Sequence, residues 1–104
     1  MYDTKLRTPQ TEQLVKALLL LETEEECYRF LEDLFTIREV RDLAQRLEVA
    51  QMLVDKVTYA EIAGRTGVSS ATIGRVNRAL SYGAGGYKIV LDKLRAETND
   101  AELK

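Results

Sequence analysis

The sequence predicts an all-α protein of six helices, and three observations support this class. Helix-start signals recur along the chain, apolar residues return at intervals of three and four, and no stretch sustains the alternation of a strand. The length of 104 residues suits one domain with a modest core. We therefore expect a single helical domain over residues 1–104.

The predicted helices begin where a threonine can cap the first turn. Thr8 precedes Pro9, and three further threonines each stand three residues before a glutamate, which is the spacing of a capping box. These pairs are Thr23 with Glu26, Thr36 with Glu39, and Thr58 with Glu61. The pattern predicts a first helix after Thr8, then helices over 24–34, 37–56, 59–66, 70–81 and 87–96, followed by a frayed polar tail over 97–104.

Most of these helices carry one apolar face that we expect to be buried. On helix 24–34 this face is Cys27, Phe30, Leu31 and Leu34; on helix 37–56 it is Val40, Leu43, Ala44, Leu47, Ala50, Leu53 and Val54; on helix 87–96 it is Ile89, Val90 and Leu94. The first helix is apolar around much of its circumference, with Leu14, Val15, Leu18, Leu19, Leu20 and Leu21. Because 104 residues offer it few partners within one chain, we expect it to pack against a second copy.

The composition excludes several classes of site. The chain has no histidine and only one cysteine, Cys27, so a Cys/His zinc site, an intramolecular disulfide and a His-based catalytic triad are all impossible. The longest apolar run, Ala17 to Leu21, is far shorter than the roughly 20 residues of a membrane span, and no signal-peptide pattern is visible. We expect a cytoplasmic protein that is not an enzyme and has no metal, cofactor or membrane partner.

Charge is distributed unevenly along the chain. Residues 22–42 hold eight acidic residues against three arginines, whereas residues 58–88 hold one acidic residue against three arginines and one lysine. Charged segments are often only solvated faces, but a basic module beside an acidic one is also typical of a protein that presents one face to a polyanion.

Gly67 lies at the centre of a helix-turn-helix pattern. Ile62 and Ala63 occupy inward positions before it, and Val68 follows it at the corner. Ser69 can cap the next helix, whose apolar face is Ile73, Val76 and Leu80. Two short helices joined by a glycine-containing turn are the arrangement of DNA-binding helix-turn-helix units, although such units also serve as packing corners.

The outward face of this unit is small, hydroxylated and basic, which suits insertion into a major groove. Gly74 leaves a bulk-free spot on this face, either for close approach to DNA or as a packing or neutral glycine. The predicted DNA-binding residues are Thr58, Tyr59, Arg65, Ser69, Ser70, Ala71, Thr72, Arg75 and Arg78.

The stretch TIREVRDLAQRLEVAQMLVDKVTYAEIAGRTGVSSATIGRVNRAL resembles the Trp repressor superfamily, in its YerC/YecD branch. The resemblance implies six helices per chain and an intertwined homodimer. Residues 8–56 and 87–96 would dimerise, and the fourth and fifth helices, within residues 58–81, would bind operator DNA. Tyr59, Ala60 and Ala63 stand where the family has basic or polar groups, so a different operator sequence is expected.

The resemblance also implies a candidate effector pocket formed by Thr36, Arg46, Arg75, Val76 and Ala79. The threonine and both arginines match residues that line the tryptophan site in the family. Val76, however, replaces the glycine that makes room for the indole, and Ala79 replaces a serine near the ligand amino group. We therefore do not expect tryptophan as corepressor, and another small effector remains open.

The predicted function is that of a dimeric, sequence-specific DNA-binding regulator, most simply a repressor, whose partners are double-stranded DNA and a second copy. The alternative is an interaction module in which the helix-turn-helix contacts the transcription machinery, with the acidic second and third helices as a further surface.

Overall fold

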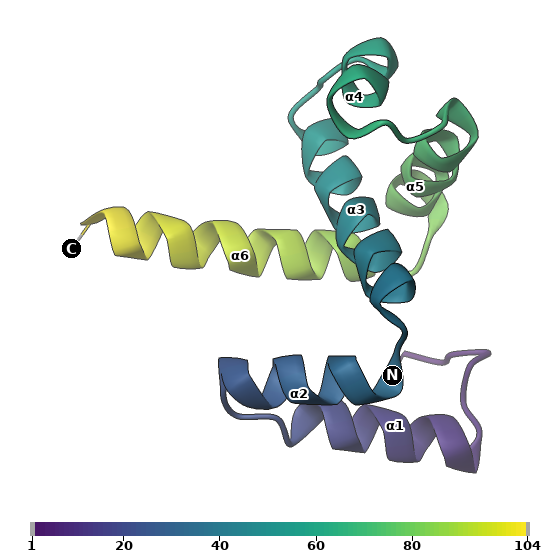
Figure 1. The fold of residues 1–104 in the computed structure, drawn as a ribbon, viewed down its shortest axis with the longest axis vertical. Helices are drawn as coiled ribbons and strands as arrows, with labels where there is room; N and C mark the ends of the chain where they lie inside the picture. The colour runs from purple at the N-terminus through teal and green to yellow at the C-terminus, as the bar shows by residue number, and fades with distance from the viewer. Residues whose placement is uncertain (1, 104) are drawn as a thin grey trace. The chain divides into compact units, whose positions relative to one another are not determined.

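The computed structural model describes residues 2–103, with side chains described for residues 2–99. It contains six α-helices in the order α1 Pro9–Leu19, α2 Glu24–Leu34, α3 Ile37–Val54, α4 Tyr59–Thr66, α5 Ser70–Tyr82 and α6 Gly86–Leu103 (Figure 1). Within residues 2–103 there is no strand. The predicted all-α class and the number of helices are confirmed.

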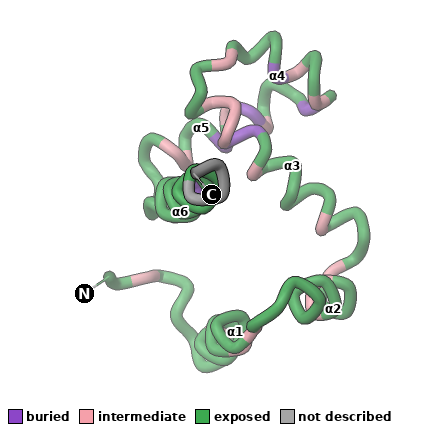
Figure 2. The backbone as a smooth tube through the Cα atoms, turned by 90° about the vertical axis from the view of Figure 1, so that its left-hand side faces the viewer, coloured by how far each residue is buried: buried purple, intermediate pink, exposed green. Residues whose placement is uncertain are grey.

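The chain divides into two compact units, Met1–Ile37 and Arg38–Lys104. The first unit contains α1 and α2, neither of which has a buried residue. The second contains nearly all of α3 and the whole of α4, α5 and α6, together with every buried residue among those whose side chains are described (Figure 2). Two helices of 11 residues each bury too little apolar surface to form a core of their own.

Thr8, Thr23 and Thr58 cap α1, α2 and α4 as predicted, but a predicted glutamate does not always bond back to its cap. Thr8 accepts from the Thr11 amide at 3.0 Å and forms a full box with it. Thr23 accepts from the Glu26 amide at 3.1 Å, but the Glu26 carboxylate accepts from the Glu22 amide instead. A glutamate near a helix start can therefore accept from more than one backbone amide, and its spacing in the sequence does not show which amide it uses.

The core of the second unit lies where α3, α4, α5 and α6 contribute apolar side chains. Its buried members are Val49, Ala50, Ile62, Val68, Ile73, Val76 and Leu91. Half-buried side chains pack around them, including Leu47, Leu53, Ala63, Leu80 and Tyr87. The helix-turn-helix is therefore held on α3 and α6 by burial, which removes roughly 25 cal/mol of unfavourable hydration per Å² of apolar surface.

Helix α6 differs from the prediction in its length and in its buried face. It continues to Leu103, because residues 97–103 contain no glycine or proline that would end a helix. The predicted tail over 97–104 is therefore helical as far as Leu103, and Lys104 lies outside the described residues. Helix α6 contacts the core through Leu91, one turn after Tyr87. The predicted inward residues Ile89, Val90 and Leu94 are exposed.

Helix α3 is also shorter than predicted, ending at Val54. Lys56 then adopts a left-handed conformation with φ of 65°, and its amide donates to the Leu53 carbonyl at 3.0 Å. This conformation ends α3 and turns the chain before α4.

The apolar faces of α1 and α2 are mostly exposed in the single chain. Leu14, Val15, Leu18, Leu19 and Leu20 all retain at least 40% of their surface accessible. On α2, Cys27 and Leu34 are exposed, while Phe30 and Leu31 are half-buried. Within the described residues, no helix is long and apolar enough to cross a membrane.

Candidate nucleic-acid interface

The corner of the helix-turn-helix forms at Gly67. Its φ of 74° is left-handed, and its amide donates to the Ala63 carbonyl at 2.8 Å, which ends α4. A residue with a Cβ is strained in this conformation, so glycine allows the chain to turn sharply. Val68 follows and is buried in the core, as the sequence predicted.

A second set of hydrogen bonds stabilises the corner, and one of its residues, Gln45, was not predicted from the sequence. The Thr66 hydroxyl donates to the Ile62 carbonyl at 2.7 Å and accepts from the Val68 amide at 3.1 Å. The Gln45 amide nitrogen on α3 donates to the Thr66 carbonyl at 3.1 Å. Because this contact joins positions 21 residues apart, no local sequence pattern indicates it.

Ser69 and Thr72, both predicted to contact DNA, are engaged at the start of α5. Ser69 Oγ accepts from the Thr72 amide at 3.2 Å and lies 3.1 Å from Thr72 Oγ1. Thr58 Oγ1 caps α4 in the same way by accepting from the Glu61 amide at 3.2 Å. These hydroxyls therefore orient the two helices, and any contact they make to DNA is additional to this role.

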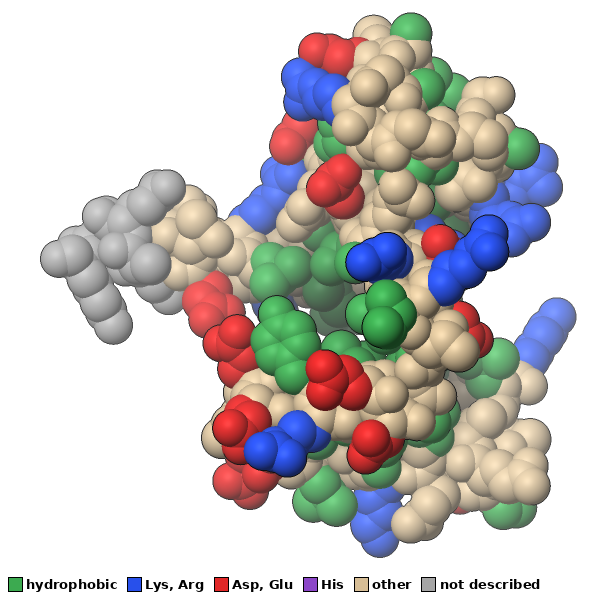
Figure 3. Space-filling view, in the orientation of Figure 1, with side chains coloured by type: hydrophobic (Ala, Val, Ile, Leu, Met, Phe, Trp, Pro, Cys, Tyr) green, Lys and Arg blue, Asp and Glu red, His purple; other side chains and the backbone are tan. Residues whose placement is uncertain are grey.

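The outward face of α5 contains the remaining predicted contacts. Ser70, Ala71, Arg75 and Arg78 are exposed, while Ile73 and Val76 on the opposite face are buried. Within residues 2–99 neither Arg75 nor Arg78 forms an ion pair, and Lys and Arg side chains gather along the outer side of α5 (Figure 3). Charges without a protein partner are available to a polyanion.

An open hollow of about 360 Å³ lies on this face. Ala71, Gly74, Arg75 and Arg78 line it. A Cβ built on Gly74 would have no atom within 4 Å, so the glycine does not serve close packing within the chain.

The predicted contacts on α4 differ from those on α5, because the arginine of α4 has an ion-pair partner. The Arg65 guanidinium lies 2.7 Å from the Glu61 carboxylate one turn earlier, so its charge is already paired. Tyr59 is exposed at the first position of the helix. Within the helix-turn-helix, the positive charge without an ion pair therefore lies on α5.

The five residues of the candidate effector pocket lie in different surroundings. Thr36 belongs to the first unit, and the other four belong to the second. Arg46 and Arg75 are exposed and Ala79 is half-buried. Val76 retains only 2% of its surface and is a member of the core.

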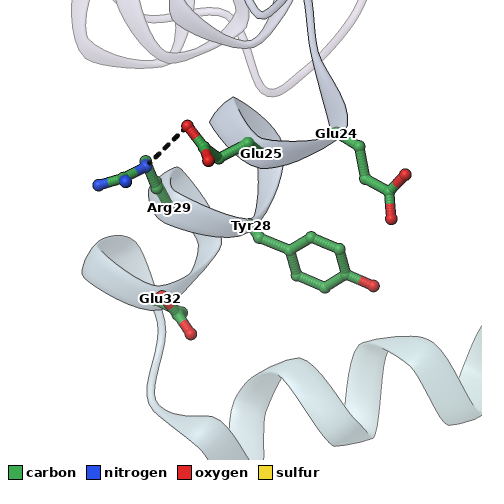
Figure 4. Close-up of a pocket in the computed structure, with 5 residues that line it drawn as sticks. All are labelled: Glu24, Glu25, Tyr28, Arg29 and Glu32. Carbon is green, nitrogen blue, oxygen red and sulfur yellow. Dashed lines mark ion pairs between the residues drawn. The ribbon is translucent and has the colours of Figure 1, made fainter.

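An acidic surface follows α2. Glu24, Glu25, Tyr28, Arg29 and Glu32 line a hollow, and acidic side chains are visible over this helix (Figures 3 and 4). Glu25 pairs with Arg29 at 3.3 Å, while Glu24 and Glu32 point away from that pair (Figure 4). This surface would repel a nucleic acid.

Comparison with known proteins gives a consistent set of relatives. Residues 9–95 match the family model described as Trp repressor protein. The uncharacterised protein YerC of Bacillus subtilis is 47% identical over 100 residues, covering 96% of each chain. A TrpR-like protein from Eubacterium eligens superposes with a TM-score of 0.82 at 51% identity, covering 86% of this chain and 93% of that one. A Staphylococcus aureus protein proposed to be a Trp repressor superposes with a TM-score of 0.82 at 45% identity, covering 88% of this chain and 91% of that one.

Proposed function

Because the chain belongs to the Trp repressor family, a family of DNA-binding regulators, we propose that it is a sequence-specific transcriptional regulator, most simply a repressor, which binds the major groove as a cytoplasmic homodimer. The observation that carries the proposal is the outward face of α5. There, two exposed arginines without ion pairs in the described part of the chain flank a surface of small side chains.

This face suits the major groove in shape and in chemistry. A groove about 12 Å wide admits one helix, and the short side chains of Ser70 and Ala71 allow the start of α5 to approach the base edges. Arg75 and Arg78 lie one and two turns further along, where they can reach phosphates or guanine. The free amides at the helix start favour a phosphate in addition.

The exposed apolar side chains support the homodimer. Leu18 and Leu19 on α1, and Ile89 and Val90 on α6, are all accessible in the single chain. Surfaces of this kind are uncommon on stable monomers, and a second copy would bury them. A dimer would also present two copies of α5 to two half-sites.

The position of Val76 argues against tryptophan as corepressor. Its side chain is a buried member of the core, and it stands where the family has the glycine that makes room for the indole, which supports a site without that space. We therefore propose that DNA binding does not depend on tryptophan, which titration calorimetry with and without the amino acid would test.

Selection of bound sequences from a random duplex pool tests the main proposal. We expect an enriched sequence with two half-sites spaced by about one helical turn, roughly 10–10.5 base pairs. No enrichment, with equally weak binding to all duplexes, would contradict it. Co-purification with RNA polymerase that persists in high salt, without any shift of duplex DNA, would instead favour the interaction module that the acidic surface of α2 suggests.

A further inference from the structure

Gly74 stands at an unusual position for a glycine. It lies within α5, five residues after the Ser69 cap, where its backbone is helical and gains nothing from the freedom of glycine. A glycine in a helix interior lowers stability relative to alanine. Since a Cβ at this position would meet no atom within 4 Å, packing within the chain does not account for the missing side chain.

Two small residues and two arginines line the hollow at this position, namely Ala71, Gly74, Arg75 and Arg78. Ala71 offers a methyl group and Gly74 has no side chain, while the arginines supply positive charge. Ala71 and Gly74 are three residues apart and Arg75 and Arg78 likewise, so each pair extends over about one turn of α5.

The C5 methyl group of thymine is the group in the major groove of B-DNA that apolar side chains contact. An apolar hollow on a helix that enters the groove therefore matches that group, while the flanking guanidinium groups match phosphate or guanine. We propose that the hollow over Gly74 receives a thymine methyl group and makes Gly74 a specificity-determining residue. This inference rests on the proposed function and adds one base to its recognition sequence.

The first experiment removes the methyl group from the DNA. In the duplex enriched by selection, each thymine is replaced in turn by deoxyuridine, which keeps every hydrogen bond of the base pair. At one position per half-site we expect binding to weaken about fourfold, as for about 0.8 kcal/mol of buried methyl group, and about 15-fold when both half-sites are changed.

The second experiment fills the hollow in the protein. Gly74→Leu introduces a strong helix former without polar groups, so α5 is not weakened and no new hydrogen bond to a base is created. Gly64→Leu on α4 is the matched control, because a Cβ at Gly64 also meets nothing within 4 Å and Gly64 does not line the hollow. We expect Gly74→Leu to bind the enriched duplex at least tenfold more weakly and to lose the preference for thymine over deoxyuridine, while Gly64→Leu keeps both.

The outcomes separate the inference from the proposed function. If the wild type selects a sequence but binds thymine and deoxyuridine duplexes equally at every position, the inference is wrong and the proposed function stands. The same conclusion follows if Gly74→Leu keeps the wild-type preference. If selection enriches nothing, both fail together.

Discussion

Removing the two unpaired arginines of α5 should change how DNA affinity depends on salt. The change is the double substitution Arg75→Ala/Arg78→Ala. Both side chains are exposed, and neither has an ion-pair partner among residues 2–99, so their loss removes charge without breaking a contact in the fold. The free energy of unfolding should therefore remain within about 0.5 kcal/mol of the wild-type value.

The magnitude follows from counterion release. Each phosphate contact contributes about 0.9 to the slope of log affinity against log salt concentration, and two arginines per chain make four contacts per dimer. The slope should then become less steep by about 3.6, so that between 50 and 200 mM salt the wild type loses about 150-fold more affinity than the variant.

Fluorescence anisotropy with a labelled duplex at four or five salt concentrations measures this slope directly. Arg29→Ala is the control, since Arg29 lies on α2 and is paired with Glu25 at 3.3 Å; its slope should match the wild type. A double variant whose slope equals that of the wild type would refute the assignment of these arginines to phosphate contacts, even if its affinity were lower.

Four further substitutions test the fold and the assembly. Ile73→Ala empties a fully buried position in the core and should lower the free energy of unfolding by about 2–5 kcal/mol in urea titrations; a loss below about 1 kcal/mol would contradict the core assignment. Gly67→Ala places a Cβ on a residue with φ of 74° and should cost about 1–2 kcal/mol, whereas Gly64→Ala in open helical surroundings should gain about 0.5–1 kcal/mol. Leu19→Asp changes a side chain that is 79% exposed in the single chain; sedimentation equilibrium should show dissociation to monomers, and an unchanged molecular mass would count against α1 as a dimer contact.

Local sequence signals predicted the helix-turn-helix well because its constraints are local. The cap at Thr58, the left-handed Gly67 and the cap at Ser69 each act within one turn of the chain, and the structure places all three as expected. The buried positions Ile62, Ile73 and Val76 also follow from helical periodicity.

Periodicity was less informative where a helix has two apolar faces. On α6 it indicated Ile89, Val90 and Leu94, but the core contact is Leu91, because the spacing of residues does not say which face meets the same chain. On α3 it omitted Val49, which is fully buried. The pairing of Arg65 with Glu61 has the i,i+4 spacing that favours an ion pair, so the sequence could have indicated it. The bond from Gln45 to Thr66 joins positions 21 residues apart, which local spacing does not indicate.

The division of α5 into a buried and an exposed face has an evolutionary consequence. Ile73 and Val76 hold the helix in place, while Ser70, Ala71, Arg75 and Arg78 are exposed and lie outside the core. Substitutions at the exposed positions are therefore nearly free of a stability penalty. Under the proposed function, one copy of a duplicated gene can acquire a new recognition sequence through a few such changes while its scaffold stays intact. Target genes can then diverge faster than structure.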